Sequence, residues 1–299
     1  MKEYVYNIDL DGADAPALLL RAVGTDKKVL EVGCASGVQT RIMTEAQRCR
    51  ITAIEIDAVA AEKAKEFCDA VIVGDLESLN LMDRLGDLRF DVITIADVLE
   101  HLRDPAAVLQ KLKPFVASDG YIVASIPNVV HAGLILDMAK GRFDYNPFGL
   151  LDDTHLRFFT LKSVCSLFEN CGFHISNIER AKKRVSETEF FRHPLSPEEQ
   201  AFVNFIRTNN PEYDTYQFVV TAKLGARMAP TASELSRRDE ASELQHEIRY
   251  LKNQVHSIST ESRVTIGKLE SQLGWIESRR IYRFLSIFKR LFVPGKSST

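Results

Sequence analysis

The sequence predicts an α/β protein with a seven-stranded, mostly parallel sheet, followed by a C-terminal coiled-coil helix. Short apolar runs alternate with helical patterns from about residue 13 to residue 224. Such alternation is typical of a parallel sheet covered by helices on both faces. Beyond residue 225 the composition becomes small and polar, and a heptad pattern follows. With 299 residues and 45% hydrophobic content, the chain is long enough for such a domain and an extension.

Seven segments are predicted to form strands, because each is short, apolar and followed by glycine or polar residues. They are residues 27–33, 51–57, 70–75, 90–97, 120–127, 173–180 and 216–224. Helical patterns lie between the first five, at 38–48, 58–67 and 105–115. The last two strands are joined by a long, partly polar connection through LSPEEQAFVNFI. This connection predicts an antiparallel last strand at the edge of the sheet.

The C-terminal part divides into a linker at 226–238, a coiled coil at 239–278 and a basic tail at 279–299. Leu244, Ile248, Leu251, Val255 and Ile258 repeat at alternating spacings of four and three, which is a heptad seam. The alternative is a single amphipathic helix folded back onto the domain. The tail holds six basic residues and no acid, interleaved with aromatic and aliphatic residues. This pattern suits an anionic membrane surface or an acidic partner, or a helix that continues the coiled coil.

Charge and cysteine content narrow the class of protein. The net charge of −3 gives no global basic surface, so nucleic acid is not an expected partner. Five scattered cysteines without a CxxC spacing argue against a disulfide framework or a zinc knuckle, and they fit a reducing cytosol. The N-terminal MKEYVYNIDLDG carries acids where a signal peptide has basic and apolar residues. We therefore expect a cytoplasmic protein, or one peripheral to the inner face of the cell membrane.

The segment VLEVGCASGVQT predicts a ligand site where the first strand ends. Gly33 and Gly37 allow a ligand to approach the backbone, and exposed N–H groups at a helix start favour a polar or anionic group. Glu31 lies near the carboxyl end of the strand, where ligands of open α/β sheets bind. Glu55 ends the second strand and is placed for both ribose hydroxyls. Asp75, placed for an adenine amino group, and Leu76, placed to pack on its ring, follow the third. Three acids and no phosphate-binding lysine indicate a nucleoside without phosphates.

These segments resemble the class I S-adenosylmethionine-dependent methyltransferases over roughly residues 13 to 224. The resemblance lies in ExGxxxG, then EID, GDLE, DVLEHLRDP and GYIVASIPN in order. Ala35 stands where the family usually has a third glycine. The resemblance implies a Rossmann-like sheet and S-adenosylmethionine as cofactor. It also implies a set of cofactor-binding residues: Glu31, Gly33, Cys34, Ala35, Gly37, Glu55, Ile56, Asp75, Leu76 and Asp97.

FDVITIADVLEHLRDP places Asp97, Glu100 and His101 beside the expected methyl donor. A hydroxyl acceptor has to lose its proton, and His101 is the predicted base. DxxEH together with His155 also resembles the ExxEH plus distal histidine of small-RNA 2′-O-methyltransferases and ubiquinone-pathway O-methyltransferases. That resemblance implies a divalent metal held by Asp97, Glu100, His101 and His155, although Asp97 is one methylene shorter than the family's Glu. A metal-free base, a metal site and a purely structural role all stay open.

The acceptor is less constrained by the sequence. Residues 131–159 are predicted to form a substrate lid, with His131 at its mouth and Phe143, Tyr145 and Phe148 available to stack on a sugar. The residue pattern GRFDYNPFGLLDDTHLRFFT, followed by a coiled coil and a basic end, resembles that of methyltransferases associated with bacterial surface-polysaccharide and glycosyltransferase systems. O-methylation of a sugar hydroxyl is the first hypothesis. The alternatives are a small-molecule, quinone-type O-methyltransferase and a non-catalytic scaffold of a glycan assembly complex. Expected partners are a glycan acceptor, and either a second copy or a glycosyltransferase through the coiled coil.

Overall fold

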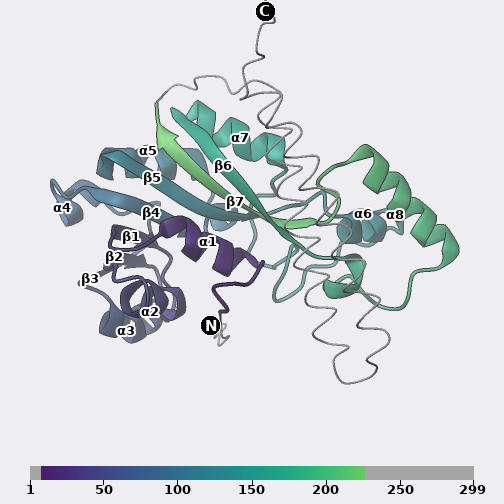
Figure 1. The fold of residues 1–299 in the computed structure, drawn as a ribbon, viewed down its shortest axis with the longest axis horizontal. Helices are drawn as coiled ribbons and strands as arrows, with labels where there is room; N and C mark the ends of the chain where they lie inside the picture. The colour runs from purple at the N-terminus through teal and green to yellow at the C-terminus, as the bar shows by residue number, and fades with distance from the viewer. Residues whose placement is uncertain (1–7, 226–299) are drawn as a thin grey trace, which may run out of the picture. The chain divides into compact units, whose positions relative to one another are not determined.

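A single mixed sheet organises the part of the chain that the structure describes. The structure, a computed structural model, describes residues 8–225. The strand order is β3-β2-β1-β4-β5-β7-β6 (Figure 1). β7 is antiparallel to both of its neighbours, while β1 to β5 pair in parallel. The strands are β1 (Lys28–Val32), β2 (Arg50–Glu55), β3 (Ala70–Val73), β4 (Phe90–Ala96), β5 (Val116–Pro127), β6 (Phe173–Lys182) and β7 (Thr215–Leu224). The predicted sheet and its antiparallel last strand are confirmed, with the difference that β7 lies inside the sheet and β6 at its edge.

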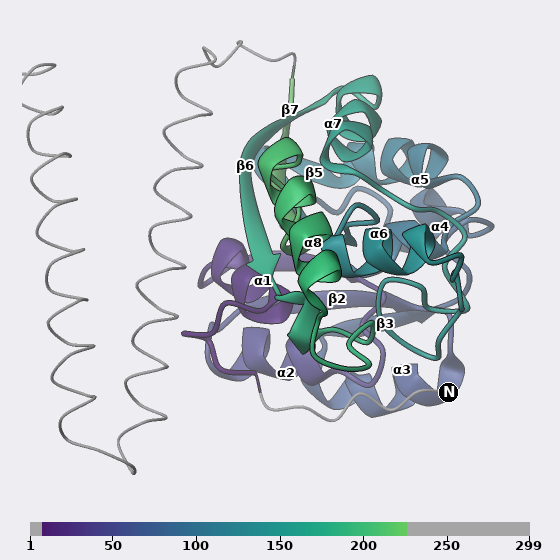
Figure 2. The same cartoon turned by 90° about the vertical axis from the view of Figure 1, so that its right-hand side faces the viewer.

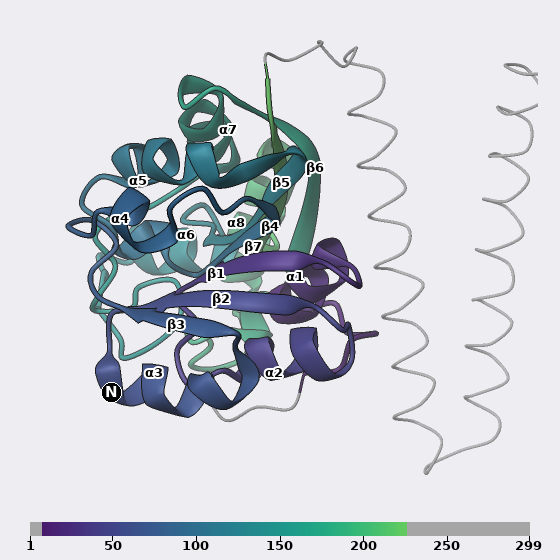
Figure 3. The ribbon, with the colours of Figure 1, turned by 90° about the vertical axis from the view of Figure 1, so that its left-hand side faces the viewer.

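Helices cover both faces of this sheet (Figures 1 and 3). One face packs on α1 (Ala15–Val23), α2 (Val38–Glu45) and α3 (Ala58–Ala64), and the other on α4 (Leu81–Leu85), α5 (Pro105–Leu112) and α7 (Leu161–Asn170). Short 3₁₀ turns occupy Lys65–Phe67, Leu99–His101, Lys113–Phe115 and Val185–Glu187. Alternate residues of β1 face opposite layers, so Leu30 packs with the α5 side and Val29 with the α1 side. Glu31 therefore shares the α1–α2 side of the sheet.

The α1 helix was not among the predicted helices. Asp14 accepts the N–H of Ala17 and caps its start. Six apolar residues of the helix are buried: Ala15, Ala17, Leu18, Leu19, Leu20 and Val23. An apolar run of this length fits a buried helix or a strand equally well, so only its packing decides.

Two further helices form a small cap beside the sheet. α6 (Ala132–Ala139) lies in the connection after β5, and α8 (Pro197–Asn209) in the connection between β6 and β7. Ala132, Leu136, Val203 and Ile206 pack together in one apolar cluster. Figure 2 shows the two helices side by side. The cap thus joins segments that are about 60 residues apart in the chain, as α6 and α8 begin at Ala132 and Pro197.

The predicted linker, coiled coil and basic tail, residues 226–299, lie outside the described residues. Among residues 8–225, no helix is both long and apolar enough to cross a lipid bilayer.

Candidate active site

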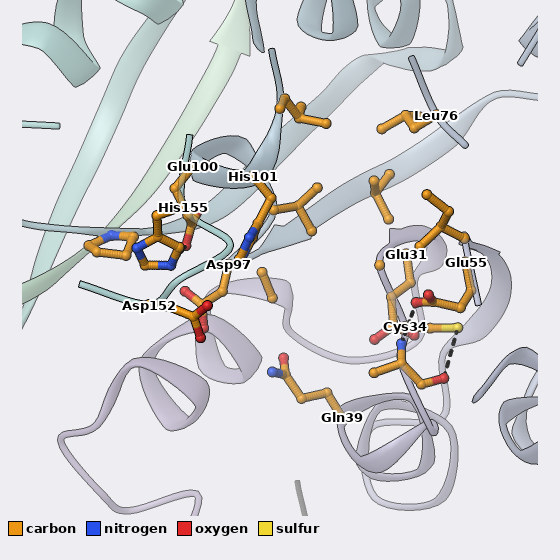
Figure 4. A pocket seen from close by; sticks show the side chains of 18 of the residues that line it. Glu31, Cys34, Gln39, Glu55, Leu76, Asp97, Glu100, His101, Asp152 and His155 are labelled. Carbon is orange, nitrogen blue, oxygen red and sulfur yellow. Dashed lines mark hydrogen bonds and ion pairs between the residues drawn. The ribbon is translucent and has the colours of Figure 1, made fainter. Parts of the chain in front are cut away.

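A pocket of about 820 Å³ opens at the carboxyl ends of the strands. Its lining comes from the segments after β1, β2, β3 and β4, from residues 148–156 and from the start of β7. All of the predicted cofactor-binding and catalytic residues except Gly37 line it. Figure 4 shows Glu31, Cys34, Glu55 and Leu76 on one side, and Asp97, Glu100, His101, Asp152 and His155 on the other. We call these sides the donor half and the acceptor half.

The turn after β1 needs its glycines for two different reasons. Gly33 has φ +77°, and a Cβ added there would lie 2.6 Å from Val98 Cγ2. Gly37 has φ +86° and begins α2, and an added Cβ would press on Ala64 of α3. Gly37 therefore shapes the turn from outside the pocket. Ala35 adopts φ +46° without a glycine. Its N–H donates to Glu55 Oε2 at 2.8 Å, which helps to hold the left-handed conformation.

The carboxylates of the donor half have partners within the protein. Glu31 is buried at 4% exposure and accepts a 2.6 Å hydrogen bond from the Thr40 hydroxyl. Burial raises the pKa of Glu31 to about 7, the Thr40 bond opposes this shift, and the Glu55 charge adds to it. Glu55 accepts the N–H groups of Ala35 and Asp57 at 2.8 and 2.9 Å. The orientation of both side chains is thus set before a ligand binds.

The far end of the donor half combines one acid with apolar side chains. Asp75 Oδ1 accepts the Glu77 N–H at 2.8 Å, and this bond fixes the loop after β3. Leu76 is buried and Ile56 is exposed, and both line the pocket. Carboxylates for hydroxyl and amino groups, apolar surfaces for a ring and a glycine turn for close approach fit S-adenosylmethionine. The residues that would hold it are those predicted, with Gly37 acting through the turn.

Glu100 is the feature that separates the acceptor half from the donor half. Its side chain is 1% exposed, and within residues 8–225 neither carboxylate oxygen has a hydrogen-bond partner. Burial raises the pKa of Glu100 well above its ordinary value, and the nearby charges of Asp97 and Asp152 raise it further. A buried carboxyl without a partner is costly, so this group requires either a proton or a cation.

His101 and His155 stand next to this carboxyl. His155 Nε2 lies 4.0 Å from Glu100 Oε1, and the two imidazole rings meet edge to face with centroids 4.8 Å apart. His155 Nδ1 donates to the Leu150 carbonyl at 3.2 Å, and His101 Nδ1 to the Thr154 carbonyl at 3.2 Å. Both rings therefore donate from Nδ1 to a backbone carbonyl, and these bonds fix the orientation of the two imidazoles.

Three of the four predicted metal ligands come together. One ligand atom each from Glu100, His101 and His155 lies within 4.8 Å of the other two. Asp97 is not part of that group, because its Oδ1 accepts from Ser125 Oγ and Gln217 Nε2, both at 2.7 Å. The Asp97 side chain is exposed to the pocket but enclosed by protein elsewhere, and this burial raises the pKa of its carboxyl. Two imidazoles and one carboxylate suit a divalent metal of the Zn or Mn type.

The structure corrects part of the predicted lid. His131 is fully buried, caps α6 through the Gly133 N–H and donates from Nε2 to the Lys183 carbonyl at 2.8 Å. The prediction that it lies at the substrate mouth is wrong, because the ring is buried, with Nδ1 used by the helix cap and Nε2 by the Lys183 carbonyl. Residues 132–139 are helix α6 and belong to the cap core. Of the three predicted aromatic residues, Phe148 lines the pocket, while Phe143 and Tyr145 contact each other outside it.

Several residues of the site were not predicted. Asp152 lines the acceptor half and accepts from Thr154 Oγ1 at 2.6 Å, so it supports the loop that holds His101. Its position in LLDDTH, three residues before His155, was the signal available for it. Lys183, Tyr216 and Gln217 line the pocket from the ends of β6 and β7. No motif marks them, since they reach the site through the pairing of these two strands.

Comparison with known proteins agrees with this geometry. A family model described as a methyltransferase domain matches residues 7–177, more than half of the chain. The ubiquinone biosynthesis O-methyltransferase of Histophilus somni is 28% identical over 167 residues, covering 50% of this chain and 69% of that protein. The enzyme of the same name from Serratia proteamaculans is 30% identical over 161 residues, covering 47% and 66%.

A solved structure supports the fold. A SAM-dependent methyltransferase from Archaeoglobus fulgidus superposes with a TM-score of 0.50 at 18% identity, covering 70% of this chain and 92% of that one. At this level of identity the likeness concerns the arrangement of strands and helices.

Proposed function

We propose, for a chain that belongs to the methyltransferase domain family, that it methylates a hydroxyl oxygen of a small, quinone-type molecule. Its methyl donor is S-adenosylmethionine. The observation that carries the proposal is the buried Glu100 carboxyl, which has no hydrogen-bond partner within residues 8–225, beside two imidazoles that each donate from Nδ1 to a backbone carbonyl. This arrangement can take a proton from a hydroxyl or hold a cation that polarises one. The names of the relatives support the small-molecule acceptor over the sugar.

The chemistry requires the protein mainly to position two groups and to accept one proton. S-adenosylmethionine supplies a methyl group on a sulfonium, which transfers by in-line displacement. Glu55 and Asp75 would hold the nucleoside, and Glu31 the amino-acid end. In the form without a metal, His101 Nε2 accepts the hydroxyl proton when the acceptor lies in the acceptor half. Thr154 orients the imidazole for this step through its hydrogen bonds to Nδ1.

A divalent metal held by Glu100, His101 and His155 is the alternative form of this step, and we favour it. His101 would then be a ligand instead of the base, and the hydroxyl proton would pass to solvent. A bound cation would neutralise the Glu100 carboxylate and lower the pKa of an acceptor hydroxyl. Without a cation, burial raises the pKa of Glu100 and so favours its protonated form, which can serve as a hydrogen-bond donor. In this second case His101 works alone as the base.

The deciding experiment measures methyl transfer from labelled donor to three kinds of acceptor, with and without chelator. Catechols, nucleotide sugars and polyprenyl-linked glycans represent the quinone-type and sugar alternatives. We expect sinefungin-sensitive transfer to a catechol, loss of it with chelator and recovery with added Mg²⁺, Mn²⁺ or Zn²⁺. Transfer to a sugar alone would contradict the acceptor, and chelator-resistant transfer would contradict the metal. No sinefungin-sensitive transfer to any acceptor would favour the scaffold hypothesis.

One observation keeps the sugar acceptor as a second candidate. Phe143, Tyr145 and Phe148 are 42%, 55% and 59% exposed, and exposed aromatic rings can stack on the apolar face of a sugar. Replacing Phe148 by Ala separates the candidates, since Phe148 lines the pocket. A sugar-specific rise in KM would favour the glycan acceptor and the glycosyltransferase or self-association partners proposed with it.

A further inference from the structure

The pocket contains a lysine that the proposed reaction does not use. Seven carboxylate side chains line the pocket, against two basic side chains, Arg103 and Lys183. Arg103 is exposed at its rim, whereas Lys183 is half-buried. A pocket of this charge suits the cationic sulfonium and ammonium groups of the donor. Lys183 is the exception that needs a reason.

The Lys183 ammonium has no anionic partner of its own. Within residues 8–225 it makes no hydrogen bond and no ion pair, and its Nζ lies 3.8 Å above the centre of the Tyr216 ring. Burial lowers the pKa of Lys183, although the negative charges of Glu189, Asp14 and Glu187 oppose this shift. A lysine can usually extend its head into water, so a half-buried ammonium on a ring is a group held in place.

The support under Lys183 is rigid. The Tyr216 hydroxyl donates to Glu189 Oε2 at 2.8 Å, and Glu189 Oε1 accepts the Leu150 N–H at 2.6 Å. Gly149 closes this contact: it has φ +91°, and an added Cβ would lie 2.2 Å from Glu189 Oε1. Both Glu189 oxygens therefore accept a hydrogen bond, one from the Tyr216 hydroxyl and one from the loop that also carries Asp152 and His155. The ammonium is left facing the pocket with its positive charge uncompensated by a direct contact.

We infer that Lys183 is the anion-binding residue of this pocket and that it takes a carboxylate of the bound ligands. Two sources can supply that group. One is the methionine end of the donor, and the other is an acidic substituent on the acceptor. For a carboxylate on the acceptor, this inference rests on the proposed function. For the carboxylate of the donor, it rests on the methyl donor alone. Both place a carboxylate opposite the ammonium, where a charge-assisted hydrogen bond forms.

The test compares Lys183→Met with Lys183→Arg and with Lys223→Met, which removes the same charge from an exposed position of β7. Calorimetry with S-adenosylhomocysteine and with 5′-methylthioadenosine, which lacks the amino-acid end, examines the donor source. If the donor supplies the carboxylate, Lys183→Met weakens S-adenosylhomocysteine about tenfold or more and leaves 5′-methylthioadenosine unchanged. Lys183→Arg restores part of the loss, and Lys223→Met has no effect.

The acceptor source is examined by binding, so that it does not depend on turnover. The probes are 3,4-dihydroxyphenylacetate and 4-methylcatechol, which differ by one carboxylate, titrated into the S-adenosylhomocysteine complex. If the acceptor supplies the group, the wild type prefers the acid and Lys183→Met loses that preference. The inference is overturned if Lys183→Met changes neither S-adenosylhomocysteine affinity nor the preference between the phenols. It is equally overturned if both nucleosides weaken to the same extent. Failure to methylate any phenol would contradict the proposed acceptor and leave the binding result standing on its own.

Discussion

Glu31 and Glu55 of the donor half and Glu100 of the acceptor half are held in opposite ways. In the donor half, Glu31 accepts from Thr40, and Glu55 accepts from two backbone N–H groups. In the acceptor half, the two Glu100 oxygens have no hydrogen-bond partner within residues 8–225, and His155 Nε2 lies 4.0 Å from Oε1. The donor half is therefore organised before its ligand arrives, whereas the acceptor half requires a proton or a cation to complete it. This difference indicates that the binding geometry around the donor is fixed in advance, while the reactive groups lie around the acceptor.

The largest effects are expected at the acceptor half. Replacing His101 by Ala should lower turnover by roughly 10²–10⁴-fold, the usual span for a general base. If a metal joins Glu100, His101 and His155, the His155→Ala variant should lose nearly as much. The double variant should then be little worse than either single one, because both changes remove the same unit. Steady-state rates on a catechol acceptor, with and without chelator, check this.

A contrasting result would change the picture of the acceptor half. If His155→Ala mainly raises KM and chelator has no effect, His155 is a residue of the substrate wall and His101 acts without a metal. His131→Ala is not a suitable control, because His131 caps α6.

The glycine turn tests how far the donor half is organised in advance. Gly33→Ala introduces a Cβ at 2.6 Å from Val98, while Gly86→Ala has the same kind of backbone, at φ +53°, with nothing within 4 Å. The Gly86 variant should lose about 1–2 kcal/mol of unfolding free energy from the left-handed backbone alone. Gly33→Ala should lose about 1–3 kcal/mol more from overpacking and should also weaken S-adenosylhomocysteine. Urea unfolding and calorimetry measure both, and equal losses at the two sites would show that Val98 moves away freely.

A smaller effect is expected from Glu55, whose carboxylate already has two backbone partners. Glu55→Ala removes the acceptor for the ribose hydroxyls, and losing a hydrogen bond to a charged group costs about 1.5–3 kcal/mol. Affinity for S-adenosylmethionine should fall at least tenfold in calorimetry. Glu55→Gln keeps one acceptor oxygen and should lose less. A folded Glu55→Ala protein with unchanged affinity would remove Glu55 from the donor site.

Glu31 makes the donor half dependent on pH. Its pKa in the folded protein is about 7, above the ordinary value of 4.5. A carboxyl with a raised pKa stabilises the folded state below pH 4.5, and this contribution is lost as the pH rises through about 7. The ligand-free wild type should therefore lose about 3 kcal/mol of unfolding free energy over this range relative to Glu31→Gln.

The same titration acts on donor affinity in the other direction. If Glu31 binds the ammonium of the donor as a carboxylate, affinity should rise with pH, by up to about tenfold per unit below the pKa. Calorimetry of S-adenosylhomocysteine between pH 6 and pH 8 measures this, and Glu31→Gln should remove the dependence. A flat profile in the wild type would separate Glu31 from the amino-acid end of the donor.

No effect on chemistry is expected from the tail. Deleting residues 279–299 should leave turnover of a soluble acceptor intact and abolish binding to anionic vesicles. Each of the six basic residues contributes on the order of 1 kcal/mol near an anionic surface. Vesicle sedimentation checks this, and equal binding by both forms would exclude the membrane role.

Sequence reasoning brought the right residues together where their position depends on neighbours in the chain. The strand-to-turn segments after β1, β2 and β3 carry Glu31, Glu55 and Asp75 at their carboxyl ends, and parallel pairing brings such ends together. The DxxEH segment likewise placed Glu100 and His101 together. His155 was connected to them through a family pattern, and the structure places its Nε2 4.0 Å from Glu100.

Sequence reasoning was less informative where distant partners decide what a side chain does. His131 follows IPN and has a polar ring, but a helix start and the Lys183 carbonyl use both of its nitrogens. Asp97 has the spacing of a metal ligand, but Ser125 and Gln217 already bond to its Oδ1. These partners come from β5 and β7, so no local pattern could reveal them.

The sequence by itself determined the strands and their order along the chain, the methyl donor and which residues meet at the donor half, because periodicity and glycine turns are local properties of the chain. Only the tertiary structure decided that β7 inserts between β5 and β6, that Glu100 is buried without a partner and that Lys183 lies on Tyr216 facing the pocket. Burial and pairing depend on groups far apart in the chain, and the pKa of an acid or the role of a lysine follows from them. The acceptor half is therefore the part of this protein whose chemistry the chain specifies only once it is folded.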